Sequence, residues 1–455
     1  MIARCLPFVA LIAVGLTSAN AATPTFSKDV APILNEHCVT CHRAGEIGPM
    51  PLLTYEQARP WAKAMRTVVA QGKMPPWHAT QERGVFSNDR RLTDEEKATL
   101  IAWADNGAPQ GNPKDLPPAP KFSEGWEIGQ PDAVLTMKTA YHVPPQGTVA
   151  YQYFEIPTNF TEDKWVQAIE VRPGVRRVVH HVLVFCRESS VAERLQSQQP
   201  AGLVSDANGI TGHGTLSGSA KAQQAAFSSI LPKMPFGVGG GGNRGVLIAT
   251  TAPGTNAMVF PAGTAVLIKA GSVLTLQVHY TANGTGADDQ TSVGMVFAKE
   301  PPQQEMHNSA FINALFTLKP GDPDTEVASM IQFNENSHIY ALFPHTHLRG
   351  KSWEYQMIYP DGHSQAVLSV PHYDFNWQTY YEFATPLAVP KGAILEGVAH
   401  YDNSPNNSSN PDPKIAVHWG EQTWQEMQYT GITFTVDQQK LAEPPTGAAE
   451  ARGQK

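Results

Sequence analysis

The first part of the chain spaces its hydrophobic residues as an α-helix does. Trp61, Met65 and Val69 recur every four positions, which places them on one helical face. A further helix is predicted after Thr93, because Thr93 and Glu96 have the spacing of a capping box and apolar residues follow. The pattern therefore predicts a helical region over residues 24–108.

From about residue 128 the period changes from helix to strand. Residues 273–280 alternate apolar and polar positions, and residues 178–185 are apolar and rich in β-branched side chains. Pro301 and Pro302 separate two strand-rich blocks, which we expect over 128–302 and 303–437. Five prolines mark residues 109–127 as a linker.

Three other stretches carry weaker structural signals. Residues 187–245 are rich in Ser, Gly and Gln and are predicted to form an insertion loop. Residues 438–455 are predicted to be a disordered tail. Residues 1–22 combine Arg4 with an apolar run and small residues before Ala22, which is typical of a signal peptide cleaved near Ala21/Ala22. We therefore expect a periplasmic or secreted protein.

The composition excludes several classes of partner. The chain has 455 residues, a net charge of −8 and 16% charged residues, so no basic footprint for nucleic acid is expected. Beyond the signal peptide no apolar run reaches the roughly 20 residues of a membrane span. The sequence leaves the oligomeric state open.

A Cys-x-x-Cys-His motif carries the strongest chemical signal. Cys38 and Cys41 have the spacing that joins both vinyl groups of a c-type haem, and His42 would be the proximal iron ligand. A redox dithiol or half of a zinc site is the alternative, although a second Cys-x-x-Cys is absent from the sequence. Met74, which precedes two prolines, is the predicted second axial ligand, with Met50 and Met65 as weaker candidates. This region, residues 23–108, is therefore expected to be an all-α cytochrome c domain.

Histidines form three groups on strand-like segments. His345 and His347 lie two apart, so on a strand both would share a face. His279 ends the alternating segment, and His180 and His181 are adjacent. Adjacent residues of a regular strand point to opposite faces, so both could reach one ion only at a strand end or a bulge. Imidazole suits copper, zinc, iron and nickel.

The order of these motifs resembles the copper type II, ascorbate-dependent monooxygenases, the family of peptidylglycine and dopamine monooxygenases. The resemblance covers roughly residues 128–437. It is carried by four segments in the family's order: Val179-His180-His181-Val182, Leu276-Gln277-Val278-His279-Tyr280, Pro344-His345-Thr346-His347-Leu348-Arg349-Gly350-Lys351 and Gln425-Glu426-Met427.

The resemblance implies a fold and a set of ligands. The expected fold class is multidomain, with the all-α cytochrome c domain followed by two all-β, jelly-roll-like sandwich domains. Two copper ions would be bound. The electron-transfer copper would have the ligands His180, His181 and His279, and the catalytic, O₂-binding copper would have the ligands His345, His347 and Met427.

Two departures from the family change the expected substrate. The position where the amidating enzyme has an arginine for a peptide carboxylate is Phe343, and the position of its tyrosine after the methionine is Gly431. An apolar or aromatic small molecule is therefore favoured over a peptide.

The expected function is C–H hydroxylation by a haem- and copper-dependent monooxygenase. Its partners would be a small-molecule substrate, O₂ and an external electron donor, with the haem passing electrons to copper. One alternative is a non-enzymatic electron-transfer or copper-handling protein on the same scaffold. Another is a reductase of small nitrogen oxides with a type 1 copper at Cys186, although the usual cluster of ligands in one loop is missing there.

Overall fold

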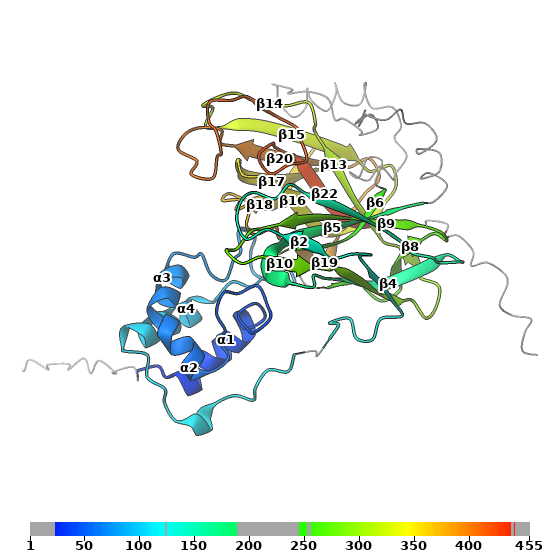
Figure 1. Ribbon diagram of the computed structural model, residues 1–455. Helices are drawn as coiled ribbons and strands as arrows, with labels where there is room; N and C mark the ends of the chain where they lie inside the picture. The colour runs from blue at the N-terminus through cyan, green and yellow to red at the C-terminus, as the bar shows by residue number, and fades with distance from the viewer. Residues whose placement is uncertain are drawn as a thin grey trace, which may run out of the picture.

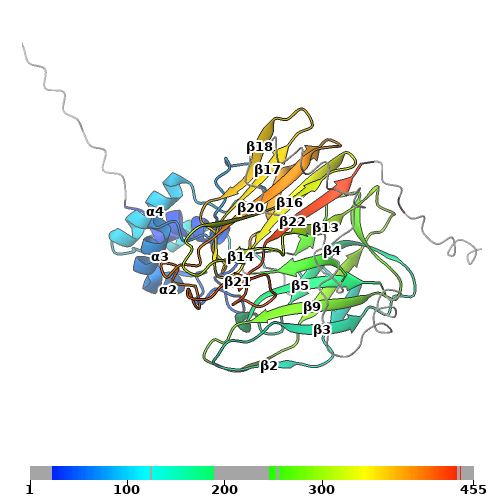
Figure 2. The same ribbon diagram turned by 90° about the horizontal axis from the view of Figure 1, so that it is seen from above.

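The computed structural model describes residues 23–437, apart from 123–124, 189–244, 253–254 and 256, and also residue 441. The predicted signal peptide and most of the predicted insertion loop and tail lie outside these residues. Figure 1 shows short helices at one side of a body made of strands. The later strands, yellow to red, lie over the earlier green ones, and Figure 2 shows the same two layers from above.

The helices occupy the N-terminal region and form a small core. Phe26, Leu34 and Trp103 are almost fully buried in it, and the indole nitrogen of Trp103 donates to the carbonyl of Pro109 at 3.0 Å. The predicted capping box exists at α4, where Thr93 Oγ1 accepts from the Glu96 amide and the Glu96 carboxylate accepts from the Thr93 amide. The segments of this region are η1 (Phe26–Val30), α1 (Ala31–His37), α2 (Tyr55–Ala58), η2 (Arg59–Trp61), α3 (Ala62–Ala70), α4 (Asp94–Asp105) and η3 (Pro113–Asp115).

The first β-sandwich packs two sheets around one apolar core, and their strands are antiparallel except that β12 runs parallel to β8. One sheet has the order β1-β11-β4-β8-β12, with β7 on β4, and the other has the order β3-β9-β5-β6. The alternating segment 273–280 forms β9, as predicted. The strands are β1 (Ala133–Thr136), β2 (Tyr141–Val143), β3 (Gln152–Pro157), β4 (Lys164–Arg172), β5 (Val179–Arg187), β6 (Val246–Thr251), β7 (Met258–Val259), β8 (Thr264–Ile268), β9, β10 (Ala287–Asp289), β11 (Ser292–Phe297) and β12 (Gln304–Glu305); η4 (Arg176–Val178) precedes β5.

The second β-sandwich repeats this arrangement with the sheets β13-β22-β16-β19 and β15-β20-β17-β18. Its strands are β13 (His307–Ile312), β14 (Thr317–Leu318), β15 (Thr325–Gln332), β16 (Ser337–His345), β17 (Gly350–Ile358), β18 (Ser364–Val370), β19 (Tyr381–Val389), β20 (Ile394–Tyr401), β21 (Val417–His418) and β22 (Tyr429–Val436). The β-sandwich character predicted from the sequence is therefore confirmed.

A smaller apolar cluster joins the two sandwiches. Leu183, Phe185 and Leu247 of the first sandwich pack in it with residues of the second, among them Phe343 and Tyr429. Burying such side chains stabilises by roughly 25 cal/mol per Å² of apolar surface. This shared cluster fixes β5 of one sandwich beside β16 and β22 of the other. His180 and His181 lie in β5, His345 ends β16, and Met427 lies two residues before β22.

The expected fold class is wrong in its all-α cytochrome c domain. The described chain has far more strand than helix, and its α-helices before residue 108 have only 7, 4, 9 and 12 residues. No α-helix occurs between residues 71 and 93, and Phe86 instead makes an antiparallel bridge with Phe383 of β19. Trp77 and Phe86 are buried in the core of the second sandwich. Helical periodicity marked the local helices, but it carried no information on where the apolar side chains between them would be buried.

No helix among the described residues is long and apolar enough to cross a membrane.

Candidate functional site

His180, His181 and His279 meet at the paired ends of β5 and β9. His181 lies opposite His279 in the antiparallel register, and the register shifts between Val179 and His181. This irregularity is the bulge that two adjacent ligands require, because it turns the His180 side chain toward the same side as His181. One ring nitrogen from each of the three histidines lies within 4.8 Å of the other two, and the Nδ1 atoms of His180 and His181 are 3.1 Å apart.

The three imidazoles have nitrogens without a protein partner. His180 Nε2, His181 Nε2 and His279 Nδ1 are buried, and none has a hydrogen-bond partner. A buried nitrogen without a partner costs free energy unless a ligand satisfies it. Burial also lowers the pKa values of His180 to about 4 and of His279 to about 3, and it holds the pKa of His181 well below its usual value. At neutral pH all three rings are therefore neutral, the form that binds metals.

His345 and His347 lie at the end of β16, with ring centroids 5.2 Å apart. Both are buried, with 3% and 0% exposure. His345 Nδ1 lies 3.0 Å from Gln378 Oε1, and His347 Nδ1 lies 3.3 Å from the carbonyl of Gln425. Donation from Nδ1 to these acceptors leaves the Nε2 lone pair available, which is how ligating histidines are usually oriented. His347 Nε2 is buried and has no hydrogen-bond partner in the protein.

The two groups of histidines come together across the interface between the sandwiches. The rings of His181 and His345 are 6.1 Å apart. Tyr151 contacts His181, His279 and His347, at centroid distances of 5.4, 4.8 and 6.2 Å. The five predicted histidine ligands therefore form one buried cluster, hereafter the histidine cluster, with Tyr151 among them.

Met427, the predicted sixth ligand, precedes β22 by two residues. β22 pairs with β16, so that Tyr429 lies opposite His345. The half-buried Met427 side chain packs against the apolar cluster between the sandwiches, and Tyr401 Oη donates to its carbonyl at 2.9 Å. The strand pairing therefore brings Met427 to the end of the sheet where His345 lies, and its thioether as a ligand stays a prediction.

A buried carboxylate fixes the backbone around these ligands. Glu426 has no exposed surface and accepts from the amides of His347 at 2.8 Å, Arg349 at 2.7 Å and Met427 at 3.1 Å. Burial raises its pKa to about 7, and the three amides and the Arg349 guanidinium oppose this rise. Arg349 donates in turn to Asn403 Oδ1 and to the carbonyl of Trp424. Glu426 therefore ties the His-x-His segment to the methionine segment.

The Cys-x-x-Cys-His segment lines a cavity of about 450 Å³. Cys38 follows α1, and the amide of His42 donates to the carbonyl of Cys38 at 2.9 Å. Burial raises the pKa of the Cys38 thiol to about 12 and that of Cys41 above its usual value, so both are neutral thiols. His42 Nδ1 lies 3.1 Å from the carbonyl of Met50, which leaves Nε2 free to bind iron.

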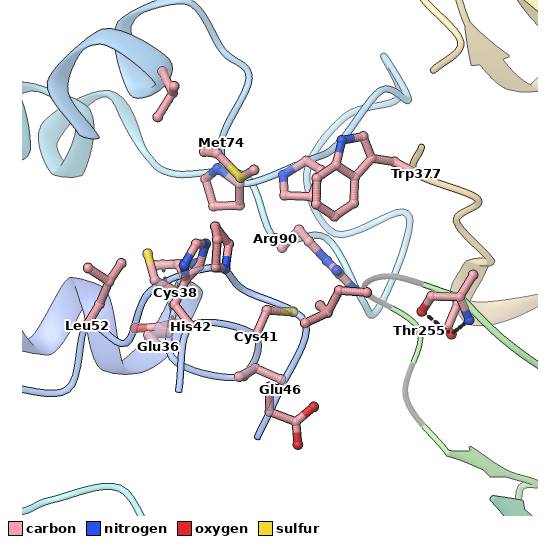
Figure 3. A pocket seen from close by; sticks show the side chains of 18 of the residues that line it. Glu36, Cys38, Cys41, His42, Glu46, Leu52, Met74, Arg90, Thr255 and Trp377 are labelled. Carbon is pink, nitrogen blue, oxygen red and sulfur yellow. Dashed lines mark hydrogen bonds and ion pairs between the residues drawn. The ribbon is translucent and has the colours of Figure 1, made fainter. Parts of the chain in front are cut away.

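Met74 reaches the same cavity from the opposite side. Figure 3 shows it across from Cys38, Cys41 and His42. Two arginines, Arg90 and Arg176, also line the cavity, and their charges suit the carboxylates of a haem. The volume falls in the usual range for cofactor sites, about 300–1,000 Å³. Thiols, an imidazole, a thioether and cations in one cavity fit a covalently bound haem; Met50 and Met65 line it too, so the choice of Met74 stays a prediction.

Cys186 and Gln277 take part in other interactions. Cys186 lies in β5 between Leu274 and Val246, and burial raises its pKa to about 11. This environment is that of a packed strand residue, so it offers nothing for a type 1 copper site. Gln277 lies two residues before His279 and donates to Tyr153 Oη at 3.0 Å.

Several residues that support the site were not predicted from the sequence. Phe375 stacks on His180 at 5.2 Å, Gln378 orients His345, and Tyr151 lies among the histidines. These three come from segments without a motif, so no sequence signal marked them. Glu426 and Arg349 do lie inside the motifs, but nothing in the sequence indicated their role.

Comparisons with known proteins add little. No family model and no curated protein matches the sequence. Among solved structures, the major capsid protein P2 of bacteriophage PM2 is similar at 10% identity and a TM-score of 0.25, covering 67% of this chain and 97% of that chain. The mavirus major capsid protein has 9% identity and a TM-score of 0.18, covering 71% and 90%. The VP2 subviral particle of infectious bursal disease virus has 10% identity and a TM-score of 0.19, covering 68% and 72%. Scores this low do not establish a shared fold, and the viral functions of these proteins do not transfer to this chain.

Proposed function

We propose that the protein is a haem- and copper-dependent monooxygenase that hydroxylates a C–H bond of a small molecule with O₂. The observation that carries the proposal is the histidine cluster. Four of its rings have a buried nitrogen without a partner: His180, His181, His279 and His347. Buried polar groups are nearly always paired in folded proteins, so four such atoms in one cluster point to bound metal.

The donor set favours copper. Neutral imidazoles suit copper and zinc alike, but a thioether near two imidazoles selects Cu(I). His180, His181 and His279 would hold one ion, and His345, His347 and Met427 would hold the other. Copper bound in this way supplies one-electron chemistry toward O₂, and a haem at Cys38, Cys41 and His42 supplies a one-electron store.

The protein's own residues would orient the ligands and exclude water. Gln378 and the carbonyl of Gln425 hold the rings of His345 and His347 in one tautomer. The low exposure of these rings keeps bulk water away from their nitrogens. Apolar and aromatic side chains beside His345, including Phe343 stacked on it at 6.0 Å, favour an apolar substrate over a charged one. The sequence motif Cys-x-x-Cys-His and the leader-like residues 1–22 agree with maturation outside the cytoplasm.

Metal analysis combined with oxygen uptake tests the proposal. Protein matured with haem and loaded with copper should contain one haem and two coppers per chain, and it should consume O₂ when a one-electron reductant is supplied. Met427→Ala should keep the fold and the first copper while O₂ uptake falls. Full O₂ uptake in that variant, or protein that binds no copper, would contradict the assignment.

A second candidate is a copper-handling or electron-transfer protein without oxygenase activity. The observation that favours it is the 6.1 Å separation of the His181 and His345 rings, which makes the histidines one cluster rather than two distant sites. One bound copper per chain and no oxygen uptake under reductant would select this candidate.

A further inference from the structure

The haem cavity is built from all three parts of the protein. The N-terminal region contributes Cys38, Cys41 and Met74, the first sandwich contributes Arg176 and His180, and the second contributes Trp377. Figure 3 shows Trp377 and Arg90 on the side of the cavity that faces the sandwiches. A cavity with such walls exists only when the N-terminal region is docked.

Backbone hydrogen bonds hold the docked segment in place. The amide of Ser87 donates to the carbonyl of Glu382 at 2.8 Å, and the amide of Ala384 donates to the carbonyl of Val85 at 2.9 Å. Phe86 lies between these bonds and packs on Phe383 and Tyr381, at ring distances of 5.2 and 5.5 Å. The segment that carries Met74 is therefore anchored on the edge of β19 and is not a free tether.

An ion pair fixes the other side of the cavity. Glu46, four residues after His42, lies 3.4 Å from the Arg176 guanidinium. Arg176 begins η4, which leads directly into β5 and His180. The loop after the Cys-x-x-Cys-His motif is thus connected to the turn that positions the first histidine ligand.

His180 belongs to both sites. It lines the haem cavity, and it is also one of the three histidines whose nitrogens lie within 4.8 Å of one another. The other members of the histidine cluster are almost completely buried, with exposures from 0% to 8%. His180 is therefore the ligand through which a group in the cavity meets the metal site.

We propose that this junction makes electron transfer intramolecular, with His180 as the entry ligand and the Glu46–Arg176 pair as the positioning contact. This inference rests on the proposed function, because it needs haem in the cavity and copper at the three histidines. One electron leaves ferrous haem, which becomes ferric, and Cu(II) becomes Cu(I). No bond breaks and no proton moves, and an external one-electron donor reduces the haem again.

The junction is tested by asking whether the rate constant of haem reoxidation depends on protein concentration. In the full chain loaded with haem and Cu(II), a photochemical reductant delivers one electron to the haem without O₂ present, and absorbance follows haem reoxidation. A fixed junction gives a first-order rate constant that stays the same over about tenfold dilution, because the partners share one molecule. A rate constant that falls in proportion to dilution, or haem that stays reduced beside bound Cu(II), overturns the inference.

A pair of variants tests the positioning contact. Arg176→Glu places two like charges at the junction, whereas Arg66→Glu disrupts a more exposed ion pair, with Asp105, in the N-terminal region. We expect slower first-order reoxidation in Arg176→Glu, no effect of Arg66→Glu on the rate, and recovery in Arg176→Lys. Haem and copper content are measured in every variant, and rates are compared only for chains that carry both. Equal rates in Arg176→Glu and Arg66→Glu overturn the role of the pair. If Arg176→Glu fails to fold, Glu46→Gln replaces it and carries the same expectation.

The same measurements distinguish failure of the proposed function from failure of the junction. Fast, concentration-independent haem reoxidation without O₂ uptake supports the junction and contradicts the oxygenase. O₂ uptake with second-order haem reoxidation supports the oxygenase and contradicts the junction. Absence of bound copper overturns both.

Discussion

Replacing Glu426 by glutamine should disrupt one of the two proposed copper sites while leaving the other intact. Glu426 Oε2 accepts from the amides of His347 and Met427, and Oε1 accepts from the amide of Arg349. Glutamine keeps one carbonyl oxygen but places an NH₂ group against an amide donor. The segments that carry His347 and Met427 would then lose their common anchor.

The expected loss of stability in Glu426→Gln follows from the hydrogen bonds that are lost. If the glutamine oxygen takes the place of Oε2, the Arg349 amide loses its acceptor and faces another donor. A hydrogen bond to a charged group contributes about 1.5–3 kcal/mol, and a buried donor without a partner costs about 1–3 kcal/mol. We expect Glu426→Gln to lower the free energy of unfolding by about 2–4 kcal/mol, and Glu426→Ala by about 3–5 kcal/mol because alanine leaves all three amides without an acceptor.

Urea unfolding and copper content measure the two effects. A matched control is Glu170→Gln, because Glu170 is a buried carboxylate that accepts from two amides, of Glu127 and Ile128, in the first sandwich. Both variants should be destabilised, but only Glu426→Gln should bind one copper where the unaltered protein binds two. Two coppers in Glu426→Gln, or one copper in Glu170→Gln, would refute the assignment of Glu426 as the anchor of the second site.

The remaining predictions concern stability and pH. Phe86→Ala should lower the free energy of unfolding by about 3–5 kcal/mol in urea, because a 3%-exposed aromatic ring leaves a cavity in the second sandwich. Thr93→Ala should cost about 1 kcal/mol in the same assay, because α4 loses its N-cap. The hydrogen bond and ion pair with Lys269 lower the pKa of Asp163, so this pair stabilises the fold above the ordinary aspartate pKa of 3.8, and the contribution disappears as pH falls through the lowered value. The difference in unfolding free energy between Asp163→Asn and the unaltered protein should stay under about 1 kcal/mol at pH 6, because the pair is partly exposed, and it should vanish near pH 2.

Each of these predictions has an experimental outcome that would contradict it. Unchanged urea midpoints in Phe86→Ala would mean that the docked segment contributes no packing. Thr99→Ala is the control for Thr93→Ala, since the Thr99 hydroxyl bonds to the carbonyl of Glu95 on the exposed surface of α4. Equal losses in both threonine variants would argue against the cap. A difference for Asp163→Asn that grows toward acid pH would reverse the assigned sign.

Local chemistry was accessible from the sequence. The capping box at Thr93, the alternation of residues 273–280 and the need for a bulge at His180 all depend on near neighbours in the chain, and the structure has each of them. Backbone geometry and side-chain spacing decide such features within a few residues. The Cys-x-x-Cys-His motif is local for the same reason.

The residues that contact the predicted ligands could not be predicted from neighbouring positions in the sequence. Phe375 on His180, Gln378 on His345 and Tyr151 among the histidines lie far from these ligands in sequence. Periodicity indicates that a side chain is buried, but it does not identify the residues against which that side chain packs. The all-α cytochrome c domain was wrong for this reason, since Trp77, Ala79 and Phe86 are buried in the core of the second sandwich.

The sequence by itself determined which side chain types could bind metal or haem, and it marked single elements such as α4 and β9. Tertiary structure alone decided that five histidines from both sandwiches converge, and that His180 lines the cavity at the Cys-x-x-Cys-His motif. The physical reason is that ligand type and secondary structure depend on short-range interactions, whereas convergence depends on how apolar faces from distant segments are buried together.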